Sequence, residues 1–166
     1  MPRYKKLYTV GWGDYELLDA GGGKKLEKWG EIITIRPEKH AYFKSGISFE
    51  KWKEMAHWEF KEHKSTAGEW INILHTDKKD WHIKYQETPF QLKLTSFKHL
   101  GLFPEQKTNW DYIKAKLNNQ DRFLNLFGYT GVASCIARST GAKVYHVDSI
   151  KQIISWANEN MNLSKN

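Results

Sequence analysis

The fold of the carboxyl-terminal part is decided by the stretch Leu124-Asn125-Leu126-Phe127-Gly128-Tyr129-Thr130-Gly131. A short apolar run followed by two glycines predicts a strand that ends in a tight turn. Residues 132–140 then predict a helix ending at Gly141, because glycine is favoured just past a helix C-terminus. Residues 144–148 predict a second strand, and residues 150–161 predict a second helix. This order of elements predicts the opening of a parallel α/β sheet.

The glycine turn and Asp148 together predict a ligand site. Both follow the carboxyl ends of predicted strands, where open parallel sheets bind their ligands. Asp148 comes 20 residues after Gly128, a spacing typical of one strand–helix–strand unit. A carboxylate placed there can accept hydrogen bonds from both hydroxyls of a ribose.

Three interpretations of this turn remain open from the residues alone. Dinucleotide sites use Gly-x-Gly-x-x-Gly, so that the backbone approaches a pyrophosphate. This chain has only Gly128-x-x-Gly131, and the Tyr129 side chain would crowd a pyrophosphate. S-adenosylmethionine (SAM) carries no phosphate, so the pattern favours SAM over NAD. A plain structural turn before a helix is the third interpretation, and Asp148 argues against it.

Residues 1–95 predict an antiparallel, β-rich α+β unit. Residues 15–36 predict a β-hairpin reversing at Gly21–Gly23, since three glycines supply positive φ angles without steric cost. No helix start follows these glycines, so a phosphate-binding loop is disfavoured. A helix is predicted over residues 49–57, capped by Ser48. Further strands are predicted over residues 58–62, 69–74, 81–86 and 90–95.

The pattern changes near residue 96, which predicts two domains. Residues 96–106 read as a loop-like connector, and residues 107–118 predict a helix. The predicted organisation is a β-rich unit over residues 1–95, followed over residues 96–166 by the first βαβα portion of a Rossmann-like domain. The fold class predicted for the chain is therefore α/β.

Composition limits the possible partners and sites. The net charge of +7 is spread along the 166 residues, which fits either a polyanionic partner or solubilising lysines. The single cysteine, Cys135, excludes an internal disulfide and a cysteine-only metal site, and fits a reducing cytoplasm. Cys135 falls on a helix face predicted to be buried, where a thiol is inert. No stretch approaches the roughly 20 apolar residues of a membrane span.

The chain resembles a family of class I SAM-dependent methyltransferases related to the bacterial 23S ribosomal RNA cytosine carbon-5 methyltransferases. The resemblance rests on the glycine-turn stretch at residues 124–134 and continues in His146-Val147-Asp148-Ser149 and in residues 156–160. It also covers Phe97–Gln106 with Asn109-Trp110, and the hairpin residues 15–19 and 25–27. It spans about residues 15–163. The stretches Phe103-Pro104-Glu105-Gln106 and Asn125–Gly131 are its most specific parts.

The resemblance implies a SAM-binding site and methyl transfer to RNA, most naturally ribosomal RNA. Gly128 and Gly131 would pass the methionine moiety, Asp148 would hold the ribose, and the loop at residues 103–106 would close over the cofactor. Lys98 and His99 lie beside that loop and would face cofactor or RNA, although a packed loop histidine is an equal interpretation. The expected cofactor-binding residues are Phe103, Pro104, Gln106, Asn125, Phe127, Gly128, Tyr129, Thr130, Gly131, Asp148 and Ser149.

The resemblance also implies that catalytic residues are missing from this chain. The family's sheet has more strands than the two predicted here, and its Asp-Pro-Pro type motif near the target base is absent. We therefore expect a fragment or truncated product whose catalytic residues lie beyond Asn166. No metal is expected, and the sequence leaves the oligomeric state open.

Two other function classes remain as alternatives. One is an RNA-binding module without catalysis, in which Trp81, His82, Lys84 and Tyr85 are exposed and the aromatic rings stack bases among lysines. A tryptophan-rich core is the competing interpretation of those aromatics. The other is an NAD-dependent Rossmann enzyme, which the incomplete glycine pattern disfavours.

Overall fold

A computed structural model describes residues 6–64 and 67–164. These residues form two compact units, described separately below. The amino-terminal unit comprises residues 12–83 and 91–100, and the carboxyl-terminal unit comprises residues 6–11, 84–90 and 101–164. Residues 6–11 and 84–90, which the sequence placed in the first unit, group with the second by contacts, and the domain boundary at residue 95 stays a prediction.

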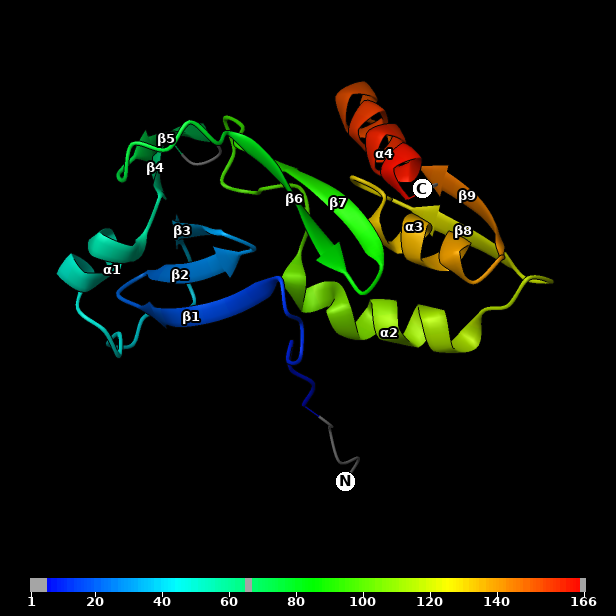
Figure 1. Ribbon diagram of the computed structural model, residues 1–166, viewed down its shortest axis with the longest axis horizontal. Helices are drawn as coiled ribbons and strands as arrows, with labels where there is room; N and C mark the ends of the chain where they lie inside the picture. Colours follow the sequence, from blue (N-terminus) through cyan, green and yellow to red (C-terminus); the bar gives the residue numbers. More distant parts are fainter. Residues whose placement is uncertain (1–5, 65–66, 165–166) are drawn as a thin grey trace. The chain divides into compact units, whose positions relative to one another are not determined.

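The amino-terminal unit is built on a five-stranded sheet in the order β1-β2-β3-β4-β5 (Figure 1). Its strands are β1 (Tyr15–Gly21), β2 (Lys24–Trp29), β3 (Ile32–Pro37), β4 (Trp58–Lys64) and β5 (Ala67–Asn72). Neighbouring strands are antiparallel, except that β3 and β4 run parallel. The connection between these two strands contains helix α1 (Phe49–Met55). The prediction of a single hairpin over residues 15–36 is wrong in one respect: Gly30, with φ of 64°, makes a second turn that divides the returning segment into β2 and β3.

Helix α1 closes the core of this unit. The Ser48 hydroxyl accepts a hydrogen bond from the Lys51 amide at 3.3 Å, which confirms the predicted cap. Trp52 is fully buried and packs with Leu26 and Ile35 of the sheet. Trp52 therefore marks the buried face of the helix.

A buried ion pair fixes the centre of the same sheet. The Glu27 carboxylate accepts hydrogen bonds from Arg36 Nε at 2.7 Å and Nη2 at 2.8 Å. Burial alone would raise the pKa of Glu27, but the adjacent guanidinium outweighs it and the pKa is lowered. Arg36 Nη1 also donates to the Lys98 carbonyl at 2.9 Å, which anchors the connector after the sheet.

Strands β6 (Asp80–Tyr85) and β7 (Thr88–Lys93) form a separate hairpin. The strand predicted over residues 81–86 is confirmed by β6, along which Trp81, Ile83 and Tyr85 are buried and alternate with exposed residues. The expectation that Trp81 and Tyr85 are exposed is consequently wrong. Trp81 Nε1 donates to the Trp29 carbonyl at 3.0 Å, and the Tyr85 ring packs edge-on against Trp110 at 5.3 Å. Of the four residues proposed to bind RNA, only His82 and Lys84 are exposed.

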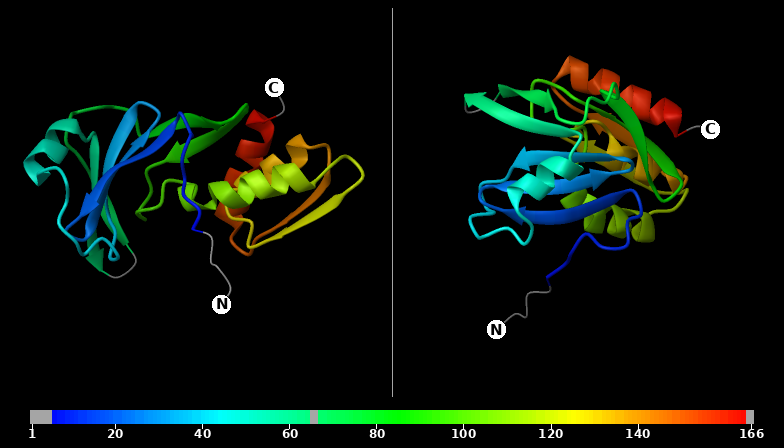
Figure 2. Two further views of the ribbon diagram at one scale, coloured as in Figure 1. Left: turned by 90° about the horizontal axis from the view of Figure 1, so that it is seen from below. Right: turned by 60° about the vertical axis from the view of Figure 1, so that its left-hand side comes forward.

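The carboxyl-terminal unit contains the predicted strand–helix–strand–helix order. Two parallel strands pair in register, and helix α3 packs against both of them. Figure 2 shows the three helices of this unit on one side of the pair. The elements are the 3₁₀ turn η1 (Pro104–Gln106), α2 (Lys107–Lys116), β8 (Arg122–Leu126), α3 (Val132–Ser139), β9 (Lys143–Val147) and α4 (Lys151–Leu163). The predicted connector over residues 96–106 is thus irregular except for η1.

The other face of the β8–β9 sheet is apolar and open among the described residues. Leu124 pairs with Tyr145, and Leu126 pairs with Val147. These four side chains are 44–58% exposed. Strand patterns that are apolar on both faces are typical of parallel sheets covered on both sides. None of the described helices combines the length and apolar character needed to cross a membrane.

Candidate functional site

The turn between β8 and α3 is held in an uncommon backbone conformation. Phe127 and Tyr129 have φ angles of 55° and 52°, in the left-handed region that side chains other than glycine rarely adopt. Each such residue costs roughly 1–3 kcal/mol and persists only when its surroundings impose it. Here the Gly128 amide donates to the Val147 carbonyl at 2.9 Å, and the Gly131 amide donates to the Gly128 carbonyl at 3.0 Å. Strain of this kind is concentrated at ligand sites.

His146 explains why residue 128 is glycine. A Cβ atom added at Gly128 would lie 2.3 Å from Cε1 of the His146 ring, so the imidazole occupies the space of a side chain. Nδ1 of this ring lies 2.9 Å from the Ser134 hydroxyl, which accepts a hydrogen bond from the Asn125 side-chain amide at 2.9 Å. Burial lowers the pKa of His146, and the nearby Asp148 charge only partly opposes this effect. A neutral imidazole therefore supports the turn at neutral pH.

Asp148 ties the turn to the end of β9. One carboxylate oxygen accepts a hydrogen bond from the Tyr129 amide at 3.0 Å, and the other accepts one from the Ile150 amide at 3.0 Å. These backbone hydrogen bonds, first that of Ile150, lower the pKa of Asp148. The side chain is thus ionised at neutral pH, and each oxygen retains a lone pair for a further donor.

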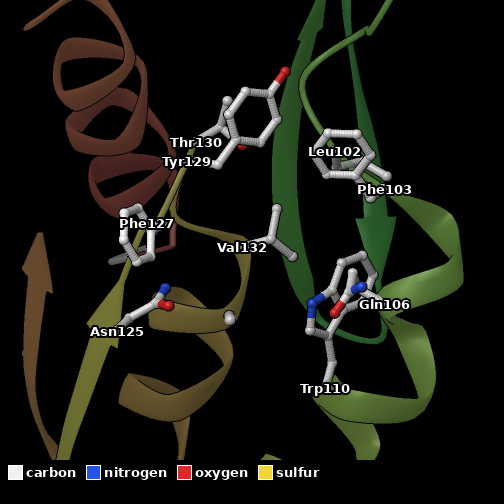
Figure 3. Close-up of a pocket in the computed structure, with 11 residues that line it drawn as sticks. Leu102, Phe103, Gln106, Trp110, Asn125, Phe127, Tyr129, Thr130 and Val132 are labelled. Atoms are coloured by element: carbon white, nitrogen blue, oxygen red, sulfur yellow. The ribbon is translucent and has the colours of Figure 1, made fainter. Parts of the chain in front are cut away.

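A cavity of about 210 Å³ opens beside the turn. In Figure 3, Asn125 and Phe127 lie on one wall, while Gln106 and Trp110 lie on the opposite wall. The Phe103 and Tyr129 rings approach each other at a centroid distance of 5.1 Å. No charged side chain lines the cavity among the described residues. The lining residues are Leu102, Phe103, Gln106, Trp110, Asn125, Phe127, Gly128, Tyr129, Thr130, Val132 and Ala133.

The structure brings most of the expected cofactor-binding residues to this cavity. Those that line it are Phe103, Gln106, Asn125, Phe127, Gly128, Tyr129 and Thr130. Four others do not line it. Pro104 is buried at the start of η1, Gly131 is the N-cap of α3, Asp148 reaches the turn through Tyr129, and Ser149 is exposed.

Sequence reasoning missed several residues of the site. Val132 and Ala133 directly follow the predicted turn, so their position was an available signal. Trp110 lies on the predicted helix, but its orientation toward the cavity depends on how α2 packs. Asn160, which is fully buried, donates its side-chain amide to the Thr130 carbonyl at 2.9 Å and supports the turn from α4. Nothing in the local sequence pointed to this last contact.

Other residues singled out from the sequence lie outside the cavity lining. Cys135 is 1% exposed, and burial raises the pKa of its thiol, in agreement with the prediction that it is inert. His99 is half-buried, and burial together with the Arg36 charge lowers its pKa. The Lys98 ammonium nitrogen lies 3.6 Å from a carboxylate oxygen of Glu62, so the two side chains form an ion pair. The described residues contain no group of three or more His, Cys, Asp or Glu side chains arranged to hold a metal ion.

Curated proteins with similar sequences are ribosomal RNA methyltransferases. The chain is 40% identical over 76 residues to the ribosomal RNA large subunit methyltransferase K/L of Shewanella amazonensis, a match covering 45% of this chain and 11% of that protein. The same enzyme of Pseudoalteromonas translucida is 37% identical over 76 residues, covering 45% and 11%. The chain thus spans about a tenth of the length of these relatives. No family model matches it.

Solved structures extend the similarity over nearly the whole chain. The SAM-dependent methyltransferase of Agrobacterium tumefaciens superimposes with a TM-score of 0.85 at 36% identity, covering 93% of this chain and 50% of that one. A protein described as a methyltransferase and complexed with S-adenosylhomocysteine (SAH) superimposes at a TM-score of 0.69 and 14% identity, covering 92% and 42%. This second likeness concerns the fold alone. Together, the comparisons confirm the predicted resemblance to SAM-dependent methyltransferases related to ribosomal RNA methyltransferases, and the α/β fold that it implied.

Proposed function

We propose that this chain forms the cofactor-binding part of a cytoplasmic SAM-dependent methyltransferase that acts on RNA. The observation that carries the proposal is the strained glycine turn, which is hydrogen-bonded to an acidic residue at the end of β9 and opens onto a cavity. The similarity to the Agrobacterium methyltransferase over 93% of the chain supports SAM as the ligand.

The residues present fit SAM. Small-molecule sites are roughly 300–1,000 Å³, so the cavity of about 210 Å³ suits one part of such a ligand. Asn125 and Gln106 offer amide groups to the amino and carboxylate groups of its methionine moiety. The Phe103 and Tyr129 rings favour the positive sulfonium, because aromatic faces attract cations. Asp148 would accept hydrogen bonds from the ribose. An uncharged lining suits SAM better than the pyrophosphate of NAD.

SAM supplies an activated methyl group that needs no metal for its transfer. The task of the residues described here is to bind and orient the cofactor, because methyl transfer depends mainly on positioning donor and acceptor. The described residues line the cavity with no carboxylate, imidazole or thiol that would remove a proton from an acceptor. We therefore propose that the cavity-lining residues bind and orient the cofactor, and that the group that accepts the proton is not among them.

RNA as the methyl acceptor is supported by the relatives and by charge. Both curated relatives are named for methylation of large-subunit ribosomal RNA. A net charge of +7 over 166 residues is favourable for a polyanionic substrate.

Calorimetric titration of the 166-residue chain tests the cofactor proposal directly. We expect SAH to bind with one-to-one stoichiometry and NAD to give no heat at the same concentrations. Phe103→Ala should weaken SAH binding, while Tyr112→Ala, at an exposed position on α2 outside the cavity, should leave it unchanged. Binding of NAD in preference to SAH would contradict the proposal.

A further inference from the structure

Two aromatic side chains project into solvent from the loop that follows β3. Tyr42 is 87% exposed and Phe43 is 55% exposed. Their rings lie 6.3 Å apart at an interplanar angle of 69°. We call residues 39–44, which carry these two rings, the aromatic loop. Large apolar side chains exposed side by side mark an interaction surface more often than side chains scattered singly.

The aromatic loop is held in place by its backbone. The Gly22 amide donates to the Phe43 carbonyl at 2.8 Å, and the Gly23 amide donates to the Ala41 carbonyl at 2.7 Å. A Cβ atom at Gly21 would lie 2.2 Å from the Ser45 nitrogen, so the close approach of the two segments requires a glycine. The three glycines between β1 and β2 therefore do more than reverse the chain, because they also seat this loop.

Asp19 secures the segment that follows the loop. Its carboxylate accepts hydrogen bonds from the Gly46 amide at 3.1 Å, the Ile47 amide at 2.7 Å and Trp52 Nε1 at 3.0 Å. The aromatic rings are thus displayed from a fixed scaffold. A preorganised surface loses little conformational entropy when it binds a partner.

The aromatic loop itself is basic. Lys39 and Lys44 are both exposed on the loop, and residues 39–49 contain no aspartate or glutamate. The nearest acid in sequence, Glu38, accepts a hydrogen bond from the His40 amide at 3.1 Å and lies 3.8 Å from Lys25. Exposed aromatic rings flanked by lysines match the chemistry of single-stranded nucleic acid, whose bases stack on rings while its phosphates pair with cations.

We propose that the aromatic loop is a stacking platform for a single-stranded segment of RNA, with Tyr42 and Phe43 contacting bases and Lys39 and Lys44 contacting phosphates. The choice of RNA rests on the proposed function, in which RNA is the methyl acceptor. The platform lies in the amino-terminal unit, whereas the cofactor cavity is built entirely from the carboxyl-terminal unit. Platform and cavity can therefore be tested independently.

Fluorescence anisotropy of a labelled single-stranded oligoribonucleotide of about ten nucleotides tests the platform. We expect Tyr42→Ala and Phe43→Ala each to weaken binding by roughly 5- to 100-fold, and Tyr42→Phe to stay within about twofold of the parent, because the ring does the stacking. Tyr112→Ala is the matched control. Tyr112 is 65% exposed with the Lys116 ammonium 5.7 Å from its ring, and it lies in the other unit. We expect it to leave RNA affinity unchanged.

Salt dependence tests the lysines separately. The double variant Lys39→Gln and Lys44→Gln should reduce the slope of log affinity against log salt by about 1.4, because each single-strand phosphate contact contributes about 0.7. RNA affinity unchanged in Tyr42→Ala, or equally reduced in Tyr112→Ala, would overturn the proposal. So would a dimer of the parent chain that dissociates in Tyr42→Ala, because the rings would then serve self-association.

A titration with SAH separates this proposal from that of the cofactor. The aromatic-loop variants should bind SAH as the parent does. RNA binding that depends on Tyr42, in a chain that fails to bind SAH, would uphold the platform and reject the methyltransferase function. If the chain binds SAH but its RNA affinity does not change in Tyr42→Ala, the cofactor proposal would be upheld and the platform rejected.

Discussion

Replacing Asp148 by asparagine removes one charge while preserving the shape of a side chain that is hydrogen-bonded to the glycine turn of the proposed site. In the parent chain, the two carboxylate oxygens accept hydrogen bonds from the Tyr129 and Ile150 amides, each at 3.0 Å. An asparagine has one oxygen, so it can satisfy only one of these amides and presents a donor to the other. The variant therefore weakens both the anchoring of the turn and the acceptor offered to a ribose.

The two effects are similar in size and appear in different measurements. Loss of one backbone hydrogen bond to the ionised carboxylate costs about 1.5–3 kcal/mol of folding free energy. A hydrogen bond from a ribose hydroxyl to a carboxylate contributes roughly 1.5–3 kcal/mol, which corresponds to a weakening of about 10- to 150-fold in Kd. SAH affinity and folding stability should therefore fall by comparable amounts, and the loss of SAH affinity is the result that indicates a ribose contact.

Isothermal titration calorimetry with SAH, together with urea unfolding, measures both quantities. Asp121→Asn is a matched control because Asp121 also accepts a backbone hydrogen bond, from the Asn118 amide at 2.8 Å, but precedes β8, at the end of the strand away from the glycine turn. We expect the control to lose a similar amount of stability and no SAH affinity. A Kd for SAH that is unchanged in Asp148→Asn would refute the ribose role and leave Asp148 as a structural residue.

Further predictions concern the support of the turn, the buried pair and the open sheet face. Gly128→Ala should destabilise the chain by about 1–3 kcal/mol through overlap with His146, and His146→Ala should restore part of this loss in a double-mutant cycle; strictly additive losses would contradict the contact. Burial lowers the pKa of His57, His99 and His146 below 6.5, so their contribution to stability is complete above pH 6.5 and decreases as the pH falls. The Tm measured by circular dichroism should therefore be lower at pH 5 than at pH 7, and a Tm that does not change with pH would refute this. Arg36→Ala should cost about 3–5 kcal/mol in urea unfolding, because buried Glu27 would lose both guanidinium hydrogen bonds and keep only Lys25 at 3.2 Å and the Tyr15 hydroxyl at 3.0 Å; a loss below about 1 kcal/mol would show that the Arg36 pair is dispensable. Leu126→Gln, at a side chain 56% exposed, should reduce the binding of an apolar dye with little change in stability, whereas marked destabilisation would mean that the face is covered.

The sequence predicted the carboxyl-terminal elements well because local signals agree there. Strand, glycine turn and helix each follow one another with clear boundaries, and the structure confirms both strands and the helices within a few residues. The amino-terminal helix was equally clear, since Ser48 caps it and Trp52 marks its buried face. In these segments, turn chemistry and hydrophobic spacing point to the same structure.

Long-range packing is what the sequence did not reveal. The second turn at Gly30 was overlooked because Trp29 and Ile32 both read as strand residues and a lone glycine is a weak signal. Trp81 was considered as an exposed base-stacking residue, yet its indole donates to the Trp29 carbonyl, 52 residues away in the chain. The contact between His146 and Gly128 joins the second strand to the turn after the first. No local pattern specifies such contacts, because they depend on how separate elements are brought together.

One residue joins the strained turn to the proposed ligand, and this coupling has a consequence for binding. Phe127 and Tyr129 keep left-handed backbone angles at a cost, and the Asp148 carboxylate is among the groups that hold them there. A ribose that contacted the same carboxylate would bind to a turn that is already fixed. The His146 ring packs against Gly128, and the side-chain amide of Asn160 on α4 donates to the Thr130 carbonyl. Because the turn already adopts the strained conformation in the free chain, less of the binding free energy would be needed to order the site. Weakening Asp148 would therefore reduce affinity twice, through the lost acceptor and through a turn that the ligand itself must order.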